Sequence, residues 1–315
     1  MRALRWDGTR LRLVSDLPDP VAGRGDALVR VRMAGICRTD LEICRGYLGF
    51  RGTLGHEWVG EVVATPDAAL AGARVVGEIN FGCGACDACR AGLARHCPAR
   101  QVQGIAGADG AFAELLAVPA TVLHRVPDGL ADRVAVFAEP VAAAFEILEQ
   151  LGDVVGVRAL VLGDGKLGNL VAQVLAAAGA RVTLAGHHPE KLGIAERLGL
   201  PTGRPEPGAD LVVDATGSPD ALREALSLVR PRGTVVLKTT VAVEHRLDLA
   251  TAVVNEVTIV GSRCGPFVPA LAALADGRVR VEPLVEAVYP LTDGVEAFSH
   301  AARPGTLKVL IAPGG

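Results

Sequence analysis

Four cysteines that fall within fifteen consecutive positions carry the most specific chemical pattern in this 315-residue chain. They are Cys83, Cys86, Cys89 and Cys97, in the spacing C-x2-C-x2-C-x7-C. Four thiolates so close in sequence can complete a tetrahedral shell around zinc and leave no open position for a substrate. The spacing therefore predicts a structural zinc site in a lobe spanning 83–97, in preference to a disulfide or a redox pair.

A second candidate metal set consists of Cys37, His56 and Glu57, which lie in two glycine-containing segments. A lone cysteine is usually a small buried apolar residue, and a lone histidine is usually a hydrogen-bonded polar group. The pairing of Gly-Ile-Cys-Arg-Thr-Asp with Gly-His-Glu-Trp-Val-Gly argues against that simpler interpretation. A catalytic zinc takes three protein ligands and leaves a fourth position for water or substrate.

A glycine fingerprint runs from Gly163 to Gly168 and follows a predicted strand. Its other candidate contacts with a cofactor are Gly165, Lys166 and Leu167. In a dinucleotide site the first glycine makes the tight turn, the second lets the backbone approach a pyrophosphate, and the third packs helix on strand. A tight turn without a ligand is the alternative, and the position between strand and helix favours a dinucleotide.

The choice between NAD and NADP depends on the residues about 20 positions further on, where an acidic residue would bind the adenosine ribose. This chain has Gly186 there, followed by His187 and His188. Without a carboxylate nothing repels a 2′-phosphate, and two imidazoles can donate hydrogen bonds to it. The sequence therefore favours NADP over NAD, while solvent-facing histidines in a loop remain the alternative interpretation.

The first half of the chain is predicted to be β-rich. Residues 28–33 alternate in period two, with Val29, Val31 and Met33 on one face and arginines between them. Further short apolar runs, separated by glycine- and proline-bearing turns, lie at 59–65, 74–77 and 112–118. Strand-like texture returns after Pro283, where 306–311 is the last predicted strand.

Beyond residue 140, strand-like and helix-like segments alternate, which predicts βαβ units and a parallel sheet. Strands are predicted at 158–162, 181–185, 211–214, 234–237 and 256–260. Helices are predicted at 141–151, 166–178, 189–198, 219–230 and 268–275, with Ser218 as the N-cap of the fourth. We therefore expect an α/β protein in which a nucleotide-binding domain (139–282) is inserted into a β-rich domain (1–138 and 283–315).

The composition sets limits on the partners. Hydrophobic residues make up 50% of the chain, which excludes a disordered protein. The formal net charge of −3 provides no global basic field for nucleic acid or a membrane surface. The first residues lack the apolar stretch of a signal peptide, and an odd number of cysteines argues against a disulfide framework. We expect a cytoplasmic protein.

These motifs, in this order, resemble the zinc-dependent medium-chain dehydrogenase/reductases, the alcohol, polyol and threonine dehydrogenase group. The resemblance covers essentially the whole length, and Glu139-Pro140 supplies a further signature before the glycine fingerprint. It implies a GroES-like β-rich catalytic domain and a doubly wound parallel-sheet (Rossmann) domain. It also implies that Cys37 and His56 bind the catalytic zinc and that Glu57 or Glu139 is the third ligand. Asp40 matches the carboxylate that orients the histidine, and Thr39 matches the hydroxyl that takes the alcohol proton.

The implied activity is hydride transfer between an alcohol (a polyol, an amino alcohol or a simple alcohol) and NAD(P), with two zinc ions per chain, in a homodimer or homotetramer. Further cofactor contacts are expected at strand ends, from Thr216, Gly261, Ser262 and Arg263. One departure is Glu42, where many members have a histidine that passes the proton to solvent. The alternatives are a zinc-independent enone or quinone reductase and a non-catalytic protein that binds zinc and a nucleotide.

Overall fold

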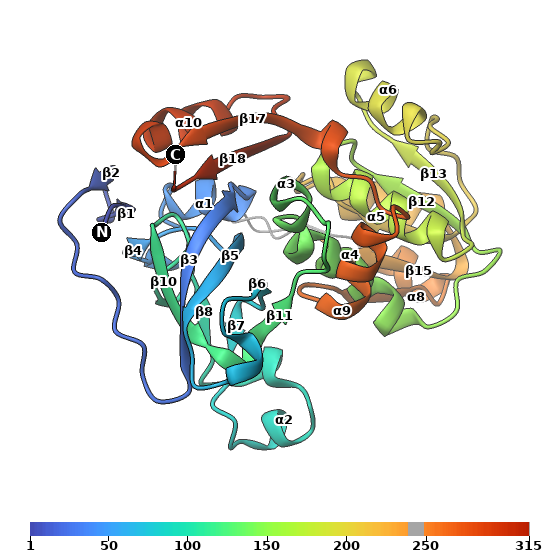
Figure 1. Cartoon of the computed structure of the whole chain (residues 1–315). Coiled ribbons are helices and arrows are strands. Elements are labelled where there is room, and N and C mark those ends of the chain that lie inside the picture. Colours follow the sequence, from blue (N-terminus) through green and yellow to red (C-terminus); the bar gives the residue numbers. More distant parts are fainter. Residues whose placement is uncertain (239–248, 315) are drawn as a thin grey trace. The chain divides into compact units, whose positions relative to one another are not determined.

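A computed structural model describes residues 1–238 and 249–314, and the chain divides into two compact units (Figure 1). The first unit comprises Met1–Glu139 and Val285–Gly315, and the second comprises Pro140–Leu284. The sequence placed the two boundaries at 138/139 and 282/283. The second unit is therefore inserted in the sequence between the two segments of the first unit.

The first unit is built mainly of antiparallel strands, and its largest sheet has the order β11-β6-β5-β3-β18-β17 with β10 added beside β3, among the described residues. The strands of this unit are β1 (Ala3–Trp6), β2 (Leu11–Val14), β3 (Asp26–Gly35), β4 (Gly52–Thr53), β5 (Glu57–Ala64), β6 (Arg74–Gly77), β7 (Asn80–Phe81), β8 (Gln101–Gln103), β9 (Gly107–Ala108), β10 (Leu115–Pro119), β11 (Leu123–Arg125), β17 (Val285–Pro290) and β18 (Lys308–Ala312). In β3, Val29 and Val31 are buried while Arg30 and Arg32 are exposed, as the period-two alternation predicts.

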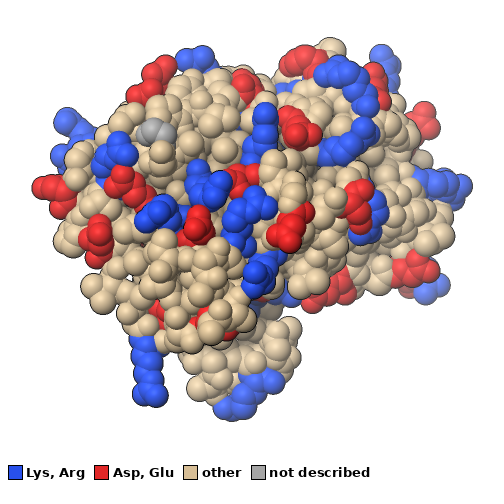
Figure 2. Space-filling model, in the orientation of Figure 1, with Lys and Arg blue, Asp and Glu red and all other residues tan. Residues whose placement is uncertain are grey.

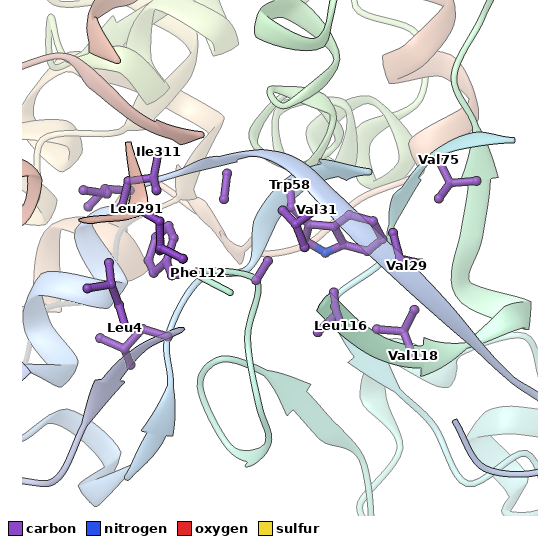
Figure 3. Packing of buried hydrophobic residues seen from close by; sticks show 14 of the residues in the cluster. Leu4, Val29, Val31, Trp58, Val75, Phe112, Leu116, Val118, Leu291 and Ile311 are labelled. Atoms are coloured by element: carbon purple, nitrogen blue, oxygen red, sulfur yellow. The ribbon is translucent and has the colours of Figure 1, made fainter. Parts of the chain in front are cut away.

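Valine, leucine and aromatic side chains from the two segments of the first unit form one core (Figure 3). The Trp58 ring of β5 lies among valines of the neighbouring strands, and its Nε1 donates to Gln103 Oε1 at 3.0 Å. Phe112 is fully buried and meets Phe298 edge to face, with ring centroids 5.4 Å apart. Such a pair adds specific geometry to apolar burial. Strand β18, from the end of the chain, pairs with β3, from its beginning.

Short helices connect these strands. They are α1 (Arg38–Ile43), α2 (Asp87–Arg90), α3 (Asp132–Ala135) and α10 (Gly294–Ala301). Sequence reasoning did not predict α10, whose buried residues include Ala297 and Phe298.

The second unit contains a parallel sheet with the order β13-β12-β14-β15-β16 among the described residues. Its strands are β12 (Arg158–Leu162), β13 (Arg181–Ala185), β14 (Ala209–Asp214), β15 (Val229–Leu237) and β16 (Thr258–Gly261). Its helices are α4 (Ala138–Leu151), α5 (Lys166–Ala177), α6 (Pro189–Arg197), α7 (Ala221–Leu228), α8 (Ala250–Val254) and α9 (Phe267–Ala275). Beyond β13, Thr202 forms a single parallel bridge with Leu184, so a further strand is reduced to one residue there. With that bridge counted, the order is that of the doubly wound dinucleotide fold.

The predicted N-cap of α7 is wrong. The helix begins at Ala221 with Asp220 as its N-cap, two residues later than predicted. The Ser218 Oγ instead accepts a hydrogen bond from the Asp220 backbone at 3.3 Å and forms a separate turn before the helix. Serine is favoured both in such turns and at N-caps, so residue type alone could not separate the two.

Acidic and basic side chains are interspersed on the face shown in Figure 2. Among the residues that the structure describes, no helix combines the length and the apolar character that crossing a membrane requires.

Candidate active site

Cys37, His56 and Glu57 converge in the first unit, with one potential ligand atom from each lying within 4.8 Å of the others. Cys37 immediately precedes α1, and Glu57 begins β5 with His56 just before it. Sulfur, imidazole nitrogen and carboxylate oxygen are zinc ligands. The donor set and its spacing therefore fit a zinc ion with three protein ligands.

The Asp40 carboxylate connects the two segments that carry these residues. Its Oδ2 accepts a hydrogen bond from the Cys37 backbone at 2.8 Å, and its Oδ1 accepts one from the Gly55 backbone at 3.3 Å. The same Oδ1 lies 3.2 Å from His56 Nδ1, without hydrogen-bond alignment. Asp40 is completely buried, so its carboxylate connects the two segments and lies beside the His56 ring.

Glu57 forms a buried ion pair with Lys308 of β18, a residue that sequence reasoning missed. Gly35, at the end of β3, makes room for this pair. A Cβ there would lie 2.6 Å from Glu57 Oε2 and 3.4 Å from Lys308 Cδ. Lys308 also lies 5.4 Å from the centre of the Phe137 ring. The lysine thus holds one carboxylate oxygen of the glutamate, and the other oxygen can serve as a metal ligand.

The electrostatics of the cluster favour a cation. Burial acts to lower the pKa of His56, but the Asp40 carboxylate and the Cys37 sulfur raise it well above its usual value. Cys44 differs, because burial and then Asp40 raise the pKa of its thiol to about 12. Cys44 therefore stays a neutral thiol and is not part of the cluster.

The remaining predicted residues of this site are placed as follows. The Thr39 hydroxyl lies 3.8 Å from Cys37 Sγ. Glu139 is the second residue of α4 and does not belong to the three-residue cluster within the described structure. Glu42 accepts hydrogen bonds from Arg38 Nε and Arg45 Nη1, both at 2.8 Å, on the surface of α1.

The four cysteines of the 83–97 lobe also converge, with their sulfur atoms within 4.8 Å of one another. Cys86 Sγ and Cys97 Sγ are 3.8 Å apart. A tetrahedron with zinc–sulfur bonds of about 2.3 Å has sulfur–sulfur edges of about 3.8 Å, so this pair has the separation that a zinc site requires. All seven cysteines are free of disulfides.

The thiols of the lobe differ in acidity. Hydrogen bonds from the Ala85 and Cys86 backbones lower the pKa of Cys83 to about 6, whereas burial raises the pKa of Cys89 to about 11. A thiolate is the form that binds zinc, and Cys83 is available in that form near neutral pH.

The glycine fingerprint in the second unit connects β12 to α5 with the geometry of a phosphate-binding turn. Gly163 has φ +110°, and a Cβ there would lie 2.7 Å from the Ala215 carbonyl oxygen. A Cβ on Gly168 would lie 1.8 Å from the Gly163 carbonyl oxygen. A Cβ on Gly165 would meet nothing within 4 Å, so the backbone there is open to a ligand. The loop therefore fits a dinucleotide pyrophosphate.

The other predicted cofactor residues lie at or just after the carboxyl ends of strands in the same parallel sheet, which share one edge. Lys238, which follows β15, was not predicted. Its Nζ donates to Ser262 Oγ at 3.1 Å and to the Arg263 carbonyl oxygen at 2.9 Å, and thereby holds the turn after Gly261. The Thr216 hydroxyl donates to Asp214 Oδ1 at 2.8 Å.

The turn after β13 has a carboxylate beside it, although position 186 is glycine. It belongs to Asp164 of the fingerprint, whose Oδ2 accepts hydrogen bonds from the backbones of His187 and His188, both at 2.7 Å. The sequence argument took residues 186–188 to have no carboxylate beside them, and that premise is wrong for the folded chain. It considered only residues 186–188, whereas Asp164 lies more than 20 residues earlier in the sequence.

Comparison with known proteins agrees with this geometry. Residues 23–128 match the alcohol dehydrogenase GroES-like domain family, and residues 167–276 match the zinc-binding dehydrogenase family. The chain is 33% identical to D-altritol 5-dehydrogenase of Agrobacterium fabrum, covering 99% of both chains. It is also 33% identical to L-threonine 3-dehydrogenase of Streptomyces avermitilis, covering 94% of both.

Solved structures share the fold over almost the whole chain. A zinc-binding dehydrogenase from Sinorhizobium meliloti 1021 bound to NADP has a TM-score of 0.90 at 28% identity, covering 99% of both chains. An alcohol dehydrogenase from Escherichia coli CFT073 complexed with NADH has a TM-score of 0.90 at 26% identity, also covering 99% of both. The two domain matches, the named relatives and the converging residues lead to one conclusion: the chain belongs to the zinc-dependent medium-chain dehydrogenase/reductase family and is an oxidoreductase that transfers hydride between an alcohol and a nicotinamide dinucleotide.

Proposed function

We propose that this enzyme holds two zinc ions per chain, a catalytic one at Cys37, His56 and Glu57 and a structural one in the four-cysteine lobe. The observation that carries the proposal is the convergence of both donor sets in the first unit. The catalytic set has three protein donors and room for one more ligand, whereas the lobe has four sulfurs and is closed. Glu57 is the third catalytic ligand in this proposal, because it lies in the cluster and Glu139 does not.

A zinc ion held by the first set would supply a Lewis acid that lowers the pKa of an alcohol, and a bound nicotinamide ring would supply the hydride acceptor. The Thr39 hydroxyl, beside Cys37, would accept the alcohol proton while it passes its own proton on to solvent. Asp40 Oδ1 faces His56 Nδ1 at 3.2 Å and Lys308 pairs with the Glu57 carboxylate, so both proposed ligands already have a charged partner in place. Glu42 is ion-paired with two arginines and takes no part in the relay.

The proposed substrates are alcohols with neighbouring polar substituents, such as polyols or amino alcohols. The relatives named for D-altritol and L-threonine support this choice over simple alcohols. We further propose NADP as the preferred cofactor, with Gly163, Gly165 and Gly168 at the pyrophosphate and His187 and His188 near the adenosine ribose.

A substrate panel tests the proposal. Purified protein is offered polyols, amino alcohols and simple alcohols with NAD or NADP, and reduced nicotinamide is followed by absorbance while zinc is counted by elemental analysis. We expect turnover of a polyol or amino alcohol and two zinc ions per chain. One zinc per chain would leave only the lobe and favour a zinc-independent reductase.

The seven free thiols support a reducing compartment such as the cytoplasm. A homo-oligomer is supported by β16, which among the described strands pairs only with β15 and leaves one edge available. Val253 and Val254 of the adjacent chain segment are 74% and 80% exposed, which is typical of a surface that another subunit covers.

A further inference from the structure

The carboxylate of Asp164 reaches from the fingerprint loop after β12 to the turn after β13. It is 6% exposed and accepts hydrogen bonds from the two backbone N–H groups of His187 and His188. His188 Nδ1 lies 2.9 Å from Asp164 Oδ1, so the ring contacts the same carboxylate. Strands β12 and β13 are neighbours in the parallel sheet, with Leu162 opposite Ala185. The contact therefore lies at the carboxyl end of the sheet, where dinucleotides bind in this fold.

Asp164 also explains why position 186 is glycine. A Cβ on Gly186 would lie 2.2 Å from Asp164 Oδ2 and 2.4 Å from Asp164 Cγ. The space that a side chain at the end of β13 would use is already filled. The carboxylate of Asp164 thus occupies the place that an acidic side chain at position 186 would take.

The carboxylate is fully engaged within the protein. Besides the three contacts to the histidine turn, Lys191 Nζ lies 3.9 Å from Oδ1. Burial acts to raise the pKa of Asp164, but hydrogen bonds from the backbone and ring of His188 and from the His187 backbone hold it below its usual value. Asp164 is therefore ionised, has the Lys191 ammonium nearby, and is too buried to accept hydrogen bonds from a ribose.

The contact with Asp164 determines what the His188 ring offers to a ligand. When Nδ1–H donates to the carboxylate, a neutral ring presents Nε2 as an acceptor, whereas a protonated ring presents Nε2–H as a donor. The His188 side chain is 46% exposed, and its Nε2 has no hydrogen-bond partner within the described part of the chain. Only the protonated ring can donate to an anion.

We propose that Asp164 positions His188 so that the protonated ring selects the 2′-phosphate of NADP. The inference rests on the proposed nucleotide function and deepens it, because it assigns the cofactor preference to one residue pair. Two charged groups lie near the His188 ring. Asp164 of the fingerprint loop contacts the ring directly, and Lys191 of α6 lies on the same carboxylate. His187 has no ring contact with Asp164 among the described residues.

Binding of two adenosine fragments tests the inference without turnover. Calorimetry measures the Kd of 2′,5′-ADP and of 5′-AMP for the whole protein at pH 6 and pH 8, for wild type, His188→Gln and His187→Gln. Glutamine keeps a polar side chain but does not titrate. A phosphate monoester itself loses charge towards pH 6, since its second pKa is about 6. The His188→Gln variant retains that effect and isolates the contribution of the ring.

We expect wild type to bind 2′,5′-ADP more tightly than 5′-AMP. The ratio of the Kd of 5′-AMP to the Kd of 2′,5′-ADP should be larger at pH 6 than at pH 8. His188→Gln should weaken 2′,5′-ADP binding about tenfold at pH 6, as for loss of one charge-assisted hydrogen bond, and should abolish the rise in the ratio. His187→Gln should keep that rise. The inference would be overturned if His188→Gln bound 2′,5′-ADP as wild type does, or if the pH dependence of the Kd ratio were lost in His187→Gln instead. Either result would leave the proposed nucleotide site unaffected. Failure of both fragments to bind wild type would overturn the nucleotide site as well.

A spectroscopic measurement separates positioning from general stability. The ¹⁵N chemical shifts of the His188 ring at pH 8 report which nitrogen carries the proton. We expect the Nδ1–H tautomer in wild type and a shift towards Nε2–H in Asp164→Asn, because the asparagine amide can donate to Nδ1. Wild type in the Nε2–H form would contradict the proposed role of Asp164.

Discussion

The glycine at position 186 is explained by Asp164, a residue distant from it in sequence. Replacing Gly186 with aspartate should not by itself create an NAD site, because its Cβ would lie 2.2 Å from Asp164 Oδ2 and two carboxylates would share one space. We expect Gly186→Asp to lower the thermal unfolding midpoint and to weaken binding of both cofactors. The paired variant Asp164→Ala/Gly186→Asp should recover the midpoint and move the kcat/KM ratio towards NAD. If Gly186→Asp alone were as stable as wild type, Asp164 would not fill the space beside position 186.

Lys308 is the second residue whose role depends on a distant partner. Lys308→Met keeps most of the apolar part of the side chain but leaves the buried Glu57 carboxylate without its cation. Breaking a buried pair on one side costs about 3–5 kcal/mol of unfolding free energy. We expect a loss of this size in chelator-treated protein, and a smaller one in zinc-loaded protein because the metal compensates the carboxylate.

Chemical denaturation of the two preparations measures this difference. The double variant Lys308→Met/Glu57→Gln serves as the control, since removing both charges should recover much of the stability of the chelator-treated protein. Equal stability of Lys308→Met and wild type after chelation would show that the ion pair contributes nothing.

At the scale of elements, the four-cysteine lobe is predicted to stabilise the fold and not to participate in chemistry. Cys89→Ser removes one of four zinc ligands, so we expect one zinc less per chain and a lower unfolding midpoint. The kcat of the folded fraction should stay within about twofold of wild type, since a four-thiolate site has no open position for substrate. Zinc analysis, calorimetry and active-site titration measure these quantities. A selective loss of kcat at unchanged stability would contradict the structural role.

Local patterns predicted the elements whose signal lies within one segment. Strands β12 and β13 begin and end at the predicted residues, because short apolar runs between glycine turns define both ends. The fingerprint and the cysteine lobe were found for the same reason. The start of α7 was missed, since Ser218 forms a turn instead of a cap. Lys308 and Asp164 carried no local signal, because 251 residues separate Lys308 from Glu57 and a fold is needed to bring them together.

At the scale of the whole molecule, the edge of β16 is the proposed contact between subunits. An edge strand offers unpaired backbone N–H and C=O groups, and two copies can pair about a two-fold axis. Ile259 on this strand is 37% exposed. We expect light scattering to give a dimer or tetramer for wild type and a smaller species for Ile259→Lys. Val21→Lys is the control, because Val21 is 91% exposed and belongs to the first unit, whereas β16 belongs to the second. A monomeric wild type at micromolar concentration would rule out the proposed assembly.

The most direct test of the account measures zinc content, turnover and nucleotide binding of Cys37→Ala in one preparation. Loss of one of three protein ligands leaves too few to hold the catalytic metal. We expect one zinc per chain in place of two, no measurable turnover, and unchanged binding of 2′,5′-ADP in the second unit. Cys44→Ala, which changes a neutral thiol outside the cluster, should keep both zinc ions and most of the activity. A Cys37→Ala enzyme that keeps two zinc ions and turns over at the wild-type rate would contradict the assignment of the catalytic site.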